Sequence, residues 1–489
     1  MPGFFGLNAW LASLALFAAA VAVLGWLAAR AHGQIAVKNQ GYIPYSDAPI
    51  FYRSENINDP VARLQKRIAS GEVTLKYDSK FGYLKSVLKE LKVPVDSQTL
   101  VYSKTSFQYP KITPEHPRAL YYNDDVYVGK VHDGKAIEIV SFDRTQGAIF
   151  YLLDEHKAER PVFQRAELDC TQCHIAAGTR GVPGVLLRSI YPTSTGTQAL
   201  DTRSFITDQD SPLKDRWGGW YVTGNAGGQQ SLANAVMNEA EQSDAASEIK
   251  KDDSVKLVSL PAKTYNFADY LTPGSDVVAH LVLAHQTQMH NLITLTNYKT
   301  RIALYNEAEK NKKAGLPDNT PLPENVRKQF ERPAEQLLRY LLFVDEAPLS
   351  GTGVEKIGGN SAFAKEFARR GLRDHQGRSL RDFDLKTRIF RYPCSYLVYS
   401  EDFDAIPEPA KTYVYHRLFT ILTGQDQSSD FARLSPDDRR AILEILLATK
   451  PGLPEEWSNY AASNHLRLAA IRPRHDRPEQ SSTAVQQGN

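Results

Sequence analysis

The chain has 489 residues, of which 42% are hydrophobic and 23% are charged, the composition of an ordinary globular protein. This length leaves room for two or three domains and is too long for a protein that consists of one small domain. The 58 basic and 56 acidic side chains nearly cancel, so no global positive field exists to attract nucleic acid, and we expect no nucleic-acid partner.

Residues 1–34 form the first distinct segment. An uncharged run over 9–29 is long enough, at about 1.5 Å per residue, to cross a hydrocarbon layer about 30 Å thick. Two interpretations compete. Ala29-Arg30-Ala31 has the small-x-small form of a signal-peptidase site, which favours a cleaved signal peptide, whereas the long run without a preceding Lys or Arg favours an N-terminal membrane anchor.

Residues 35–165 predict an N-terminal α+β region. Two segments have apolar residues at helical spacing and end at Gly71 and Pro94. From Thr99 the pattern changes to short runs rich in Val, Ile, Tyr and Phe, separated by polar turns. We expect a small antiparallel sheet built from four segments: TLVYSK, ALYYNDDVYVGKV, KAIEIVSFD and AIFYLLDE.

The remainder divides into a loop-rich region, 166–272, and a mainly helical region, 273–460. Gly, Pro, Ser and Thr dominate the first, and long ordered loops are often functional. The tail, 461–489, has few apolar residues and predicts disorder. The fold class is therefore α+β. The expected C-terminal helices cover 276–313, 323–345, 359–371, 408–423 and 435–449.

The loop-rich region begins with the most specific motif of the chain, Cys170-x-x-Cys173-His174. Two thiols at this spacing can add to the two vinyl groups of one porphyrin, and the adjacent imidazole then lies under the iron. A zinc site would need two further ligands, and a redox Cys-x-x-Cys would need a βαβ setting. We therefore expect one covalent haem c, with His174 as proximal iron ligand. The third cysteine, Cys394, lies in an apolar run and predicts a buried, inert thiol.

The motif also predicts location, because covalent haem attachment takes place on the outer face of the bacterial membrane. We expect a periplasmic protein, either soluble after signal cleavage or tethered to the inner membrane by residues 9–29.

The distal iron ligand has several candidates on one predicted helix, SDVVAHLVLAHQTQMHNLITL. His285 and Met289 fall on its apolar stripe, whereas His280 and His290 lie to either side. We expect His285 as the distal ligand, with Met289 and His290 as weaker candidates. Core packing is the alternative for Met289, and a hydrogen-bonded structural imidazole is the alternative for His285.

Haem would also need partners for its propionates and its apolar faces. Arg188 and Arg216 are candidates for forked pairing with propionates, and Trp220 is a candidate for a wall of the haem pocket. The alternative is that each arginine is a surface or structural residue.

Six segments together resemble a large family of bacterial exported cytochrome c-like proteins with a single haem motif, largely uncharacterised in function. The resemblance covers about residues 95–455 and implies haem c at Cys170, Cys173 and His174. The family pattern often has a His-containing loop after WYVTG, where this chain reads NAGGQQSLANA, so a ligand or proton relay from that loop would be missing here. The six segments are ALYYNDDVYVGKV, CTQCH, GVPG, SPLKDRWGGWYVTG, HQTQMHN and RYPCSYLVYS.

Three functions are compatible with these observations. Electron transfer to a redox partner protein, through an iron with both axial positions filled, is the first. A peroxidase-like or oxygenase-like haem enzyme with an open distal site is the second, and a haem-based sensor or assembly factor is the third. The sequence does not predict the oligomeric state.

Overall fold

A computed structural model describes residues 43–238, 256–261, 264–349, 355–466 and 470–471. The expected signal peptide or anchor, 1–34, and most of the expected disordered tail lie outside these residues. Among the helices in the described ranges, none combines the length and the apolar character needed to cross a membrane.

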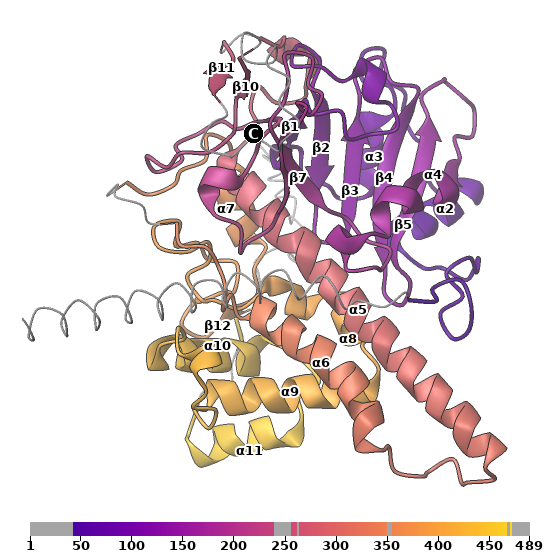
Figure 1. The fold of residues 1–489 in the computed structure, drawn as a ribbon, viewed down its shortest axis with the longest axis vertical. Coiled ribbons are helices and arrows are strands. Elements are labelled where there is room, and N and C mark those ends of the chain that lie inside the picture. Colours follow the sequence, from indigo (N-terminus) through magenta and orange to yellow (C-terminus); the bar gives the residue numbers. More distant parts are fainter. Residues whose placement is uncertain (1–42, 239–255, 262–263, 350–354, 467–469, 472–489) are drawn as a thin grey trace, which may run out of the picture.

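A seven-stranded antiparallel sheet forms the upper part of the molecule in Figure 1 and confirms the α+β fold class. Its order is β6-β5-β4-β3-β2-β1-β9, and its four central strands correspond to the expected runs of β-branched and aromatic residues. The strands are β1 (Thr99–Val101), β2 (Arg118–Tyr122), β3 (Val126–Lys130), β4 (Ala136–Asp143), β5 (Gly147–Asp154), β6 (Phe163–Arg165) and β9 (Trp220–Tyr221).

The two faces of the sheet belong to different hydrophobic clusters. Helices α2 (Pro60–Ala69) and α3 (Leu84–Glu90) contribute to the smaller cluster, together with Val128 and Ile139 of the sheet. Tyr127 and Phe142 point to the opposite face and join the larger cluster, because successive side chains in a strand alternate between faces.

The long helix α5 (Val277–Lys313) connects the sheet to the helical part of the molecule (Figure 1). Asp276 caps its N-terminus by accepting hydrogen bonds from the amides of Val278 and Ala279. Every residue from 275 to 298 is buried. A helix buried on all sides has no solvent face, so an apolar stripe in its sequence does not identify one functional side.

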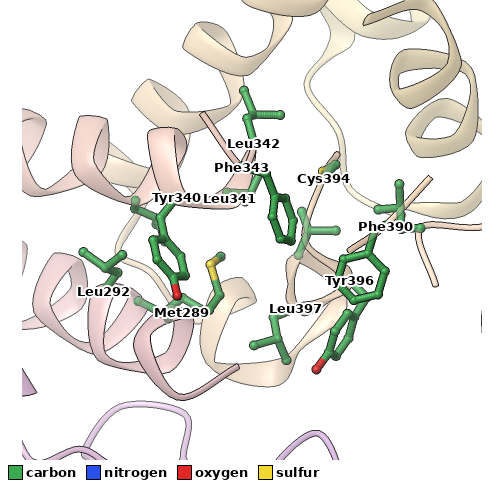
Figure 2. Close-up of a cluster of buried hydrophobic side chains, with 14 of the residues drawn as sticks. Met289, Leu292, Tyr340, Leu341, Leu342, Phe343, Phe390, Cys394, Tyr396 and Leu397 are labelled. Carbon is green, nitrogen blue, oxygen red and sulfur yellow. The ribbon is translucent and has the colours of Figure 1, made fainter. Parts of the chain in front are cut away.

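Most of the helical part lies below the sheet in Figure 1, whereas the short helix α7 (Phe363–Arg369) lies beside the sheet near the N-terminal end of α5; the expected helices are found close to their predicted bounds. Ser435 caps α10 by accepting from the Asp438 amide, as the capping sequence predicts. The larger hydrophobic cluster extends from the sheet through α5 into these helices, and Figure 2 shows the part around Met289 and Phe343. The helices are α6 (Glu324–Leu341), α7 (Phe363–Arg369), α8 (Glu401–Asp404), α9 (Glu408–Leu422), α10 (Pro436–Thr449) and α11 (Glu455–Ser463).

The region expected to be loop-rich contains more regular structure than its composition predicts. Helix α4 (Glu167–His174) carries the Cys-x-x-Cys-His motif, and β9 adds the last strand of the large sheet. Short strands in Gly-rich sequence are stabilised by their pairing partners, so they leave little local signal. The small sheets pair β7 (Leu187–Ile190) with β8 (Ser204–Thr207), β10 (Ala235–Met237) with β11 (Leu257–Ser259), and β12 (Arg373–Asp374) with β13 (Ala470–Ile471).

Candidate haem-binding site

Helix α4 presents the motif on the edge of the sheet, where it packs against β5. Cys170 is partly buried against the larger hydrophobic cluster, whereas Cys173 is exposed. Burial, with the nearby carboxylates of Glu138 and Asp169, raises the pKa of Cys170 to about 11. A thiol held in its protonated form does not suit a redox-active Cys-x-x-Cys, which needs a thiolate with a lowered pKa.

The imidazole of His174 is fixed by one of its two nitrogens. Nδ1 lies 2.8 Å from the carbonyl oxygen of Gly184 and donates to it, and the ring packs on Phe150 with 4.9 Å between centroids. Burial lowers the pKa of His174, which keeps the ring neutral. Nε2 has no hydrogen-bond partner in the described part of the chain and retains its lone pair. A proximal iron ligand needs this arrangement.

The loop after the motif is held in place by Thr179, which is fully buried. Its hydroxyl accepts from the Ala176 amide at 3.0 Å and donates to the Val182 carbonyl at 2.8 Å. The amide of Gly184 donates to the His174 carbonyl at 3.0 Å. The acceptor for the imidazole is therefore part of a rigid loop.

Two amide side chains of α5 hold this loop from the other side, and the sequence patterns did not identify either of them. Asn291 makes two hydrogen bonds to Val185, to its amide at 3.1 Å and to its carbonyl at 2.8 Å. Gln288 donates to the Gly178 carbonyl at 2.8 Å. A methyl group on Gly184 would lie 2.0 Å from the Asn291 amide oxygen, so this close approach requires glycine. Amides in the middle of an apolar helix are the signal that could have indicated this contact.

His285, the expected distal ligand, has both ring nitrogens engaged elsewhere. Nδ1 lies 2.6 Å from the Gln209 side-chain oxygen, and Nε2 lies 2.7 Å from the Ser395 hydroxyl. The first contact requires Nδ1–H to donate, so Nε2 accepts from the hydroxyl. Burial lowers the pKa of His285 to about 3, which agrees with a neutral ring. The structure therefore places His285 as a hydrogen-bonded structural imidazole.

His290 is also engaged at both nitrogens, and both must donate. Nδ1 lies 2.8 Å from the Asp402 carboxylate, and Nε2 lies 2.7 Å from the Asp124 carbonyl. Burial alone would lower the pKa of His290, but the Asp402 carboxylate, together with Asp125 and the Asp124 carbonyl, outweighs burial and raises it. An imidazolium that donates from both nitrogens has no lone pair for iron. The geometry does not support His290 as the distal ligand.

Met289 and His280 likewise make their contacts with residues outside the motif loop. Met289 is fully buried in the cluster with Leu292 and Leu341, so the structure supports core packing for it (Figure 2). His280 Nε2 contacts the Ser275 hydroxyl and the Tyr221 carbonyl, while its Nδ1 is buried without a partner. His280 precedes Asn291 by 11 positions, about 16 Å along the helix axis.

The expected propionate and wall residues have other contacts. Arg216 is fully buried and donates to the carbonyls of Ser211 and Gln209 at 2.8 and 2.9 Å, while its remaining terminal nitrogen has no partner among the described residues, so its pairing with a propionate stays a prediction. Trp220 donates from Nε1 to the Arg188 carbonyl at 2.9 Å and packs edge-on against His280. The Arg188 side chain is exposed on β7, and its role at a haem stays a prediction.

Two further findings concern the cysteines and metal ligands. Cys394 is fully buried, as expected, and burial raises the pKa of its thiol. Within the described ranges, no group of three or more His, Cys, Asp and Glu side chains converges to hold a metal ion.

The comparisons with family models, curated proteins and solved structures find no match to this chain. The resemblance to exported cytochrome c-like proteins stays a prediction.

Proposed function

We propose that the chain is an exported haem c protein, with thioether bonds to Cys170 and Cys173 and with His174 as the proximal iron ligand. The observation that carries this proposal is the His174 imidazole, which is neutral, fixed through Nδ1 to the Gly184 carbonyl and free at Nε2. In metal-ligating histidines, a hydrogen bond from the ring nitrogen that does not bind the metal to a carbonyl oxygen fixes the tautomer in this way.

The surface beside the motif suits an apolar cofactor. Leu120, Val140 and Leu152 lie in the middle of strands, yet all three are only partly buried. They point to the same sheet face as Phe150, on which His174 packs. Apolar side chains on a central strand are normally covered, so this partly uncovered face supports a place for a flat apolar group.

Electron transfer to a redox partner protein is the function that we favour for this site. Cys173 is exposed, and Leu168 on the same helix is 68% exposed. The attached edge of a haem would therefore lie near the surface, where a partner can approach. When bound, haem would supply one-electron chemistry. Thr179, Gln288 and Asn291 would hold the His174 loop rigid, which limits the structural change that accompanies a change of iron charge.

A haem enzyme or sensor with an exchangeable sixth position is the second candidate. One observation favours it, namely that His285 and His290 are hydrogen-bonded at both nitrogens and Met289 is enclosed in the core. The three expected distal ligands are therefore not available without rearrangement of the core.

Optical spectra of the purified holoprotein, oxidised, reduced and reduced under carbon monoxide, test both candidates. Electron transfer with a closed iron predicts low-spin spectra that carbon monoxide does not change. An exchangeable sixth position predicts rapid carbon monoxide binding. Protein purified from a host with haem c maturation that carries no haem would contradict both.

A further inference from the structure

The sheet face beside the motif carries a partly buried ion pair between Arg118 on β2 and Glu138 on β4. The two atoms Nη2 and Oε2 lie 2.6 Å apart, and the side chains are 17% and 13% exposed. An ion pair that solvent still reaches contributes little to stability, so it is weak evidence for a purely stabilising role. The pair therefore needs a further explanation.

Gly129 on the intervening strand β3 permits this pair to form. Strand register places Gly129 opposite both Leu120 and Glu138, so the guanidinium must cross two strand spacings, about 10 Å, to reach the carboxylate. A methyl group on Gly129 would lie 2.6 Å from Nη2 and 2.8 Å from Nε of Arg118. The guanidinium thus lies flat over the glycine backbone.

The two partners differ in how completely their hydrogen-bonding groups are used. Glu138 accepts from Arg118, and its Oε1 also accepts from the Ser106 hydroxyl at 2.5 Å and from the Gln108 amide at 2.8 Å. Nε of Arg118, in contrast, is buried and has no partner among the described residues. Other arginines in the described ranges, Arg216 among them, also bury an N–H without an acceptor, so this feature alone does not identify a site. At Arg118 it lies beside the motif and leaves a donor for a second anion.

This pair lies close to the motif. Val140 is the next residue after Glu138 on the same face, and it lies opposite Phe150, on which the His174 ring packs. Leu120, two residues from Arg118 on the same face, packs against the same cluster as Cys170. The charges of Arg118 and Glu138 also act on both Cys170 and His174.

We propose that Arg118 binds a propionate carboxylate of the haem and that Glu138 is a positioning residue that orients its guanidinium. This inference rests on the proposed haem site and adds Arg118 to the candidates for a propionate partner. The expected anion is a carboxylate. One terminal nitrogen of the Arg118 guanidinium already donates to Glu138, and Nε, which has no acceptor among the described residues, is left to donate to a second carboxylate.

The test uses the full-length holoprotein with Arg118→Gln, Arg118→Lys and Glu138→Gln, and with Arg327→Gln as the matched control from an exposed arginine on α6. Resonance Raman spectra report the propionate bending mode, and redox titration reports the midpoint potential. We expect Arg118→Gln to lower the frequency of the propionate mode and the potential, because it removes a hydrogen bond and a positive charge near the iron. Arg118→Lys retains the charge, so its potential should stay closer to that of the wild type.

Glu138→Gln should raise the potential, because it removes a negative charge, and Arg327→Gln should change neither quantity. Haem-loaded Arg118→Gln and Arg118→Lys proteins with wild-type propionate bands would overturn the inference and leave a structural ion pair. A wild-type protein without covalent haem would instead overturn the proposed function, so the two failures are distinguishable.

Discussion

The imidazole in the motif differs from the imidazoles of His285 and His290 on α5 in which ring nitrogens have hydrogen-bond partners. His174 is partly exposed at the sheet edge, uses one nitrogen on a backbone carbonyl and keeps the other. His285 and His290 are fully buried, and every ring nitrogen has a partner.

From this difference we expect the capacity to bind a metal to depend on unused lone pairs and not on residue type or helical spacing. His285 joins the loop at Gln209 to the segment at Ser395, and His290 joins the β2–β3 turn to Asp402 on α8. Both rings connect elements that are distant in sequence. We therefore interpret α5 as a structural helix whose polar side chains hold neighbouring segments by hydrogen bonds. The motif loop, which α5 holds in this way, is the candidate haem site.

Among the substitutions that test this comparison, His174→Ala should have the largest effect, and the quantity affected is the haem content. We expect His174→Ala to reduce covalent haem per protein by roughly tenfold or more, because the iron loses its fixed axial ligand. His156→Ala is the control, since that side chain is exposed and, within the described part of the chain, hydrogen-bonds only to Asp154. Haem absorbance per protein mass measures the effect. Equal haem content in the two variants would contradict the assignment of His174.

Substitution of His285 should affect stability and leave the haem spectrum unchanged. His285→Ala removes two buried hydrogen bonds, with Gln209 and Ser395, and opens a cavity. We expect the free energy of unfolding to fall by about 2–4 kcal/mol, measured by urea denaturation. A change of iron spin state in the folded variant, measured by its optical spectrum, would show that His285 is a ligand after all.

The smallest effect concerns Asp125, in the turn that His290 binds. Burial, followed by the charges of Asp124 and Asp402, raises the pKa of Asp125 to about 7, although the His290 charge opposes this shift. Below the ordinary carboxyl pKa both states are protonated. As pH rises toward 7, the unfolded chain ionises first, so the wild type loses stability through this group.

Asp125→Asn does not titrate and should escape that loss. Because Asp125 is partly exposed, solvent screening limits the effect, and we expect the wild type to lose about 1 kcal/mol more than the variant between pH 5 and pH 8. Urea midpoints at the two pH values provide the measurement. Equal pH dependence in the two proteins would show that Asp125 is ionised throughout.

Much of the fold is predictable from local pattern, whereas the surroundings of the motif are not. Alternating β-branched residues predict β2 to β5, and helical spacing with the Ser435 cap predicts α10. The motif itself predicts its three haem residues. The roles of Arg118 and Asn291 depend on strand register and on the rotation of a buried helix, which residue spacing alone does not determine.

The pyridine haemochrome spectrum of the wild-type holoprotein tests the central claim most directly, with Cys170→Ala and Cys173→Ala beside it. We predict the band position of haem with two saturated thioether bonds in the wild type, a shift toward one remaining vinyl group in each single variant, and haem that stays with the denatured polypeptide. Haem that acidified butanone extracts from the wild type, or a spectrum that neither cysteine substitution changes, would contradict covalent attachment at this motif.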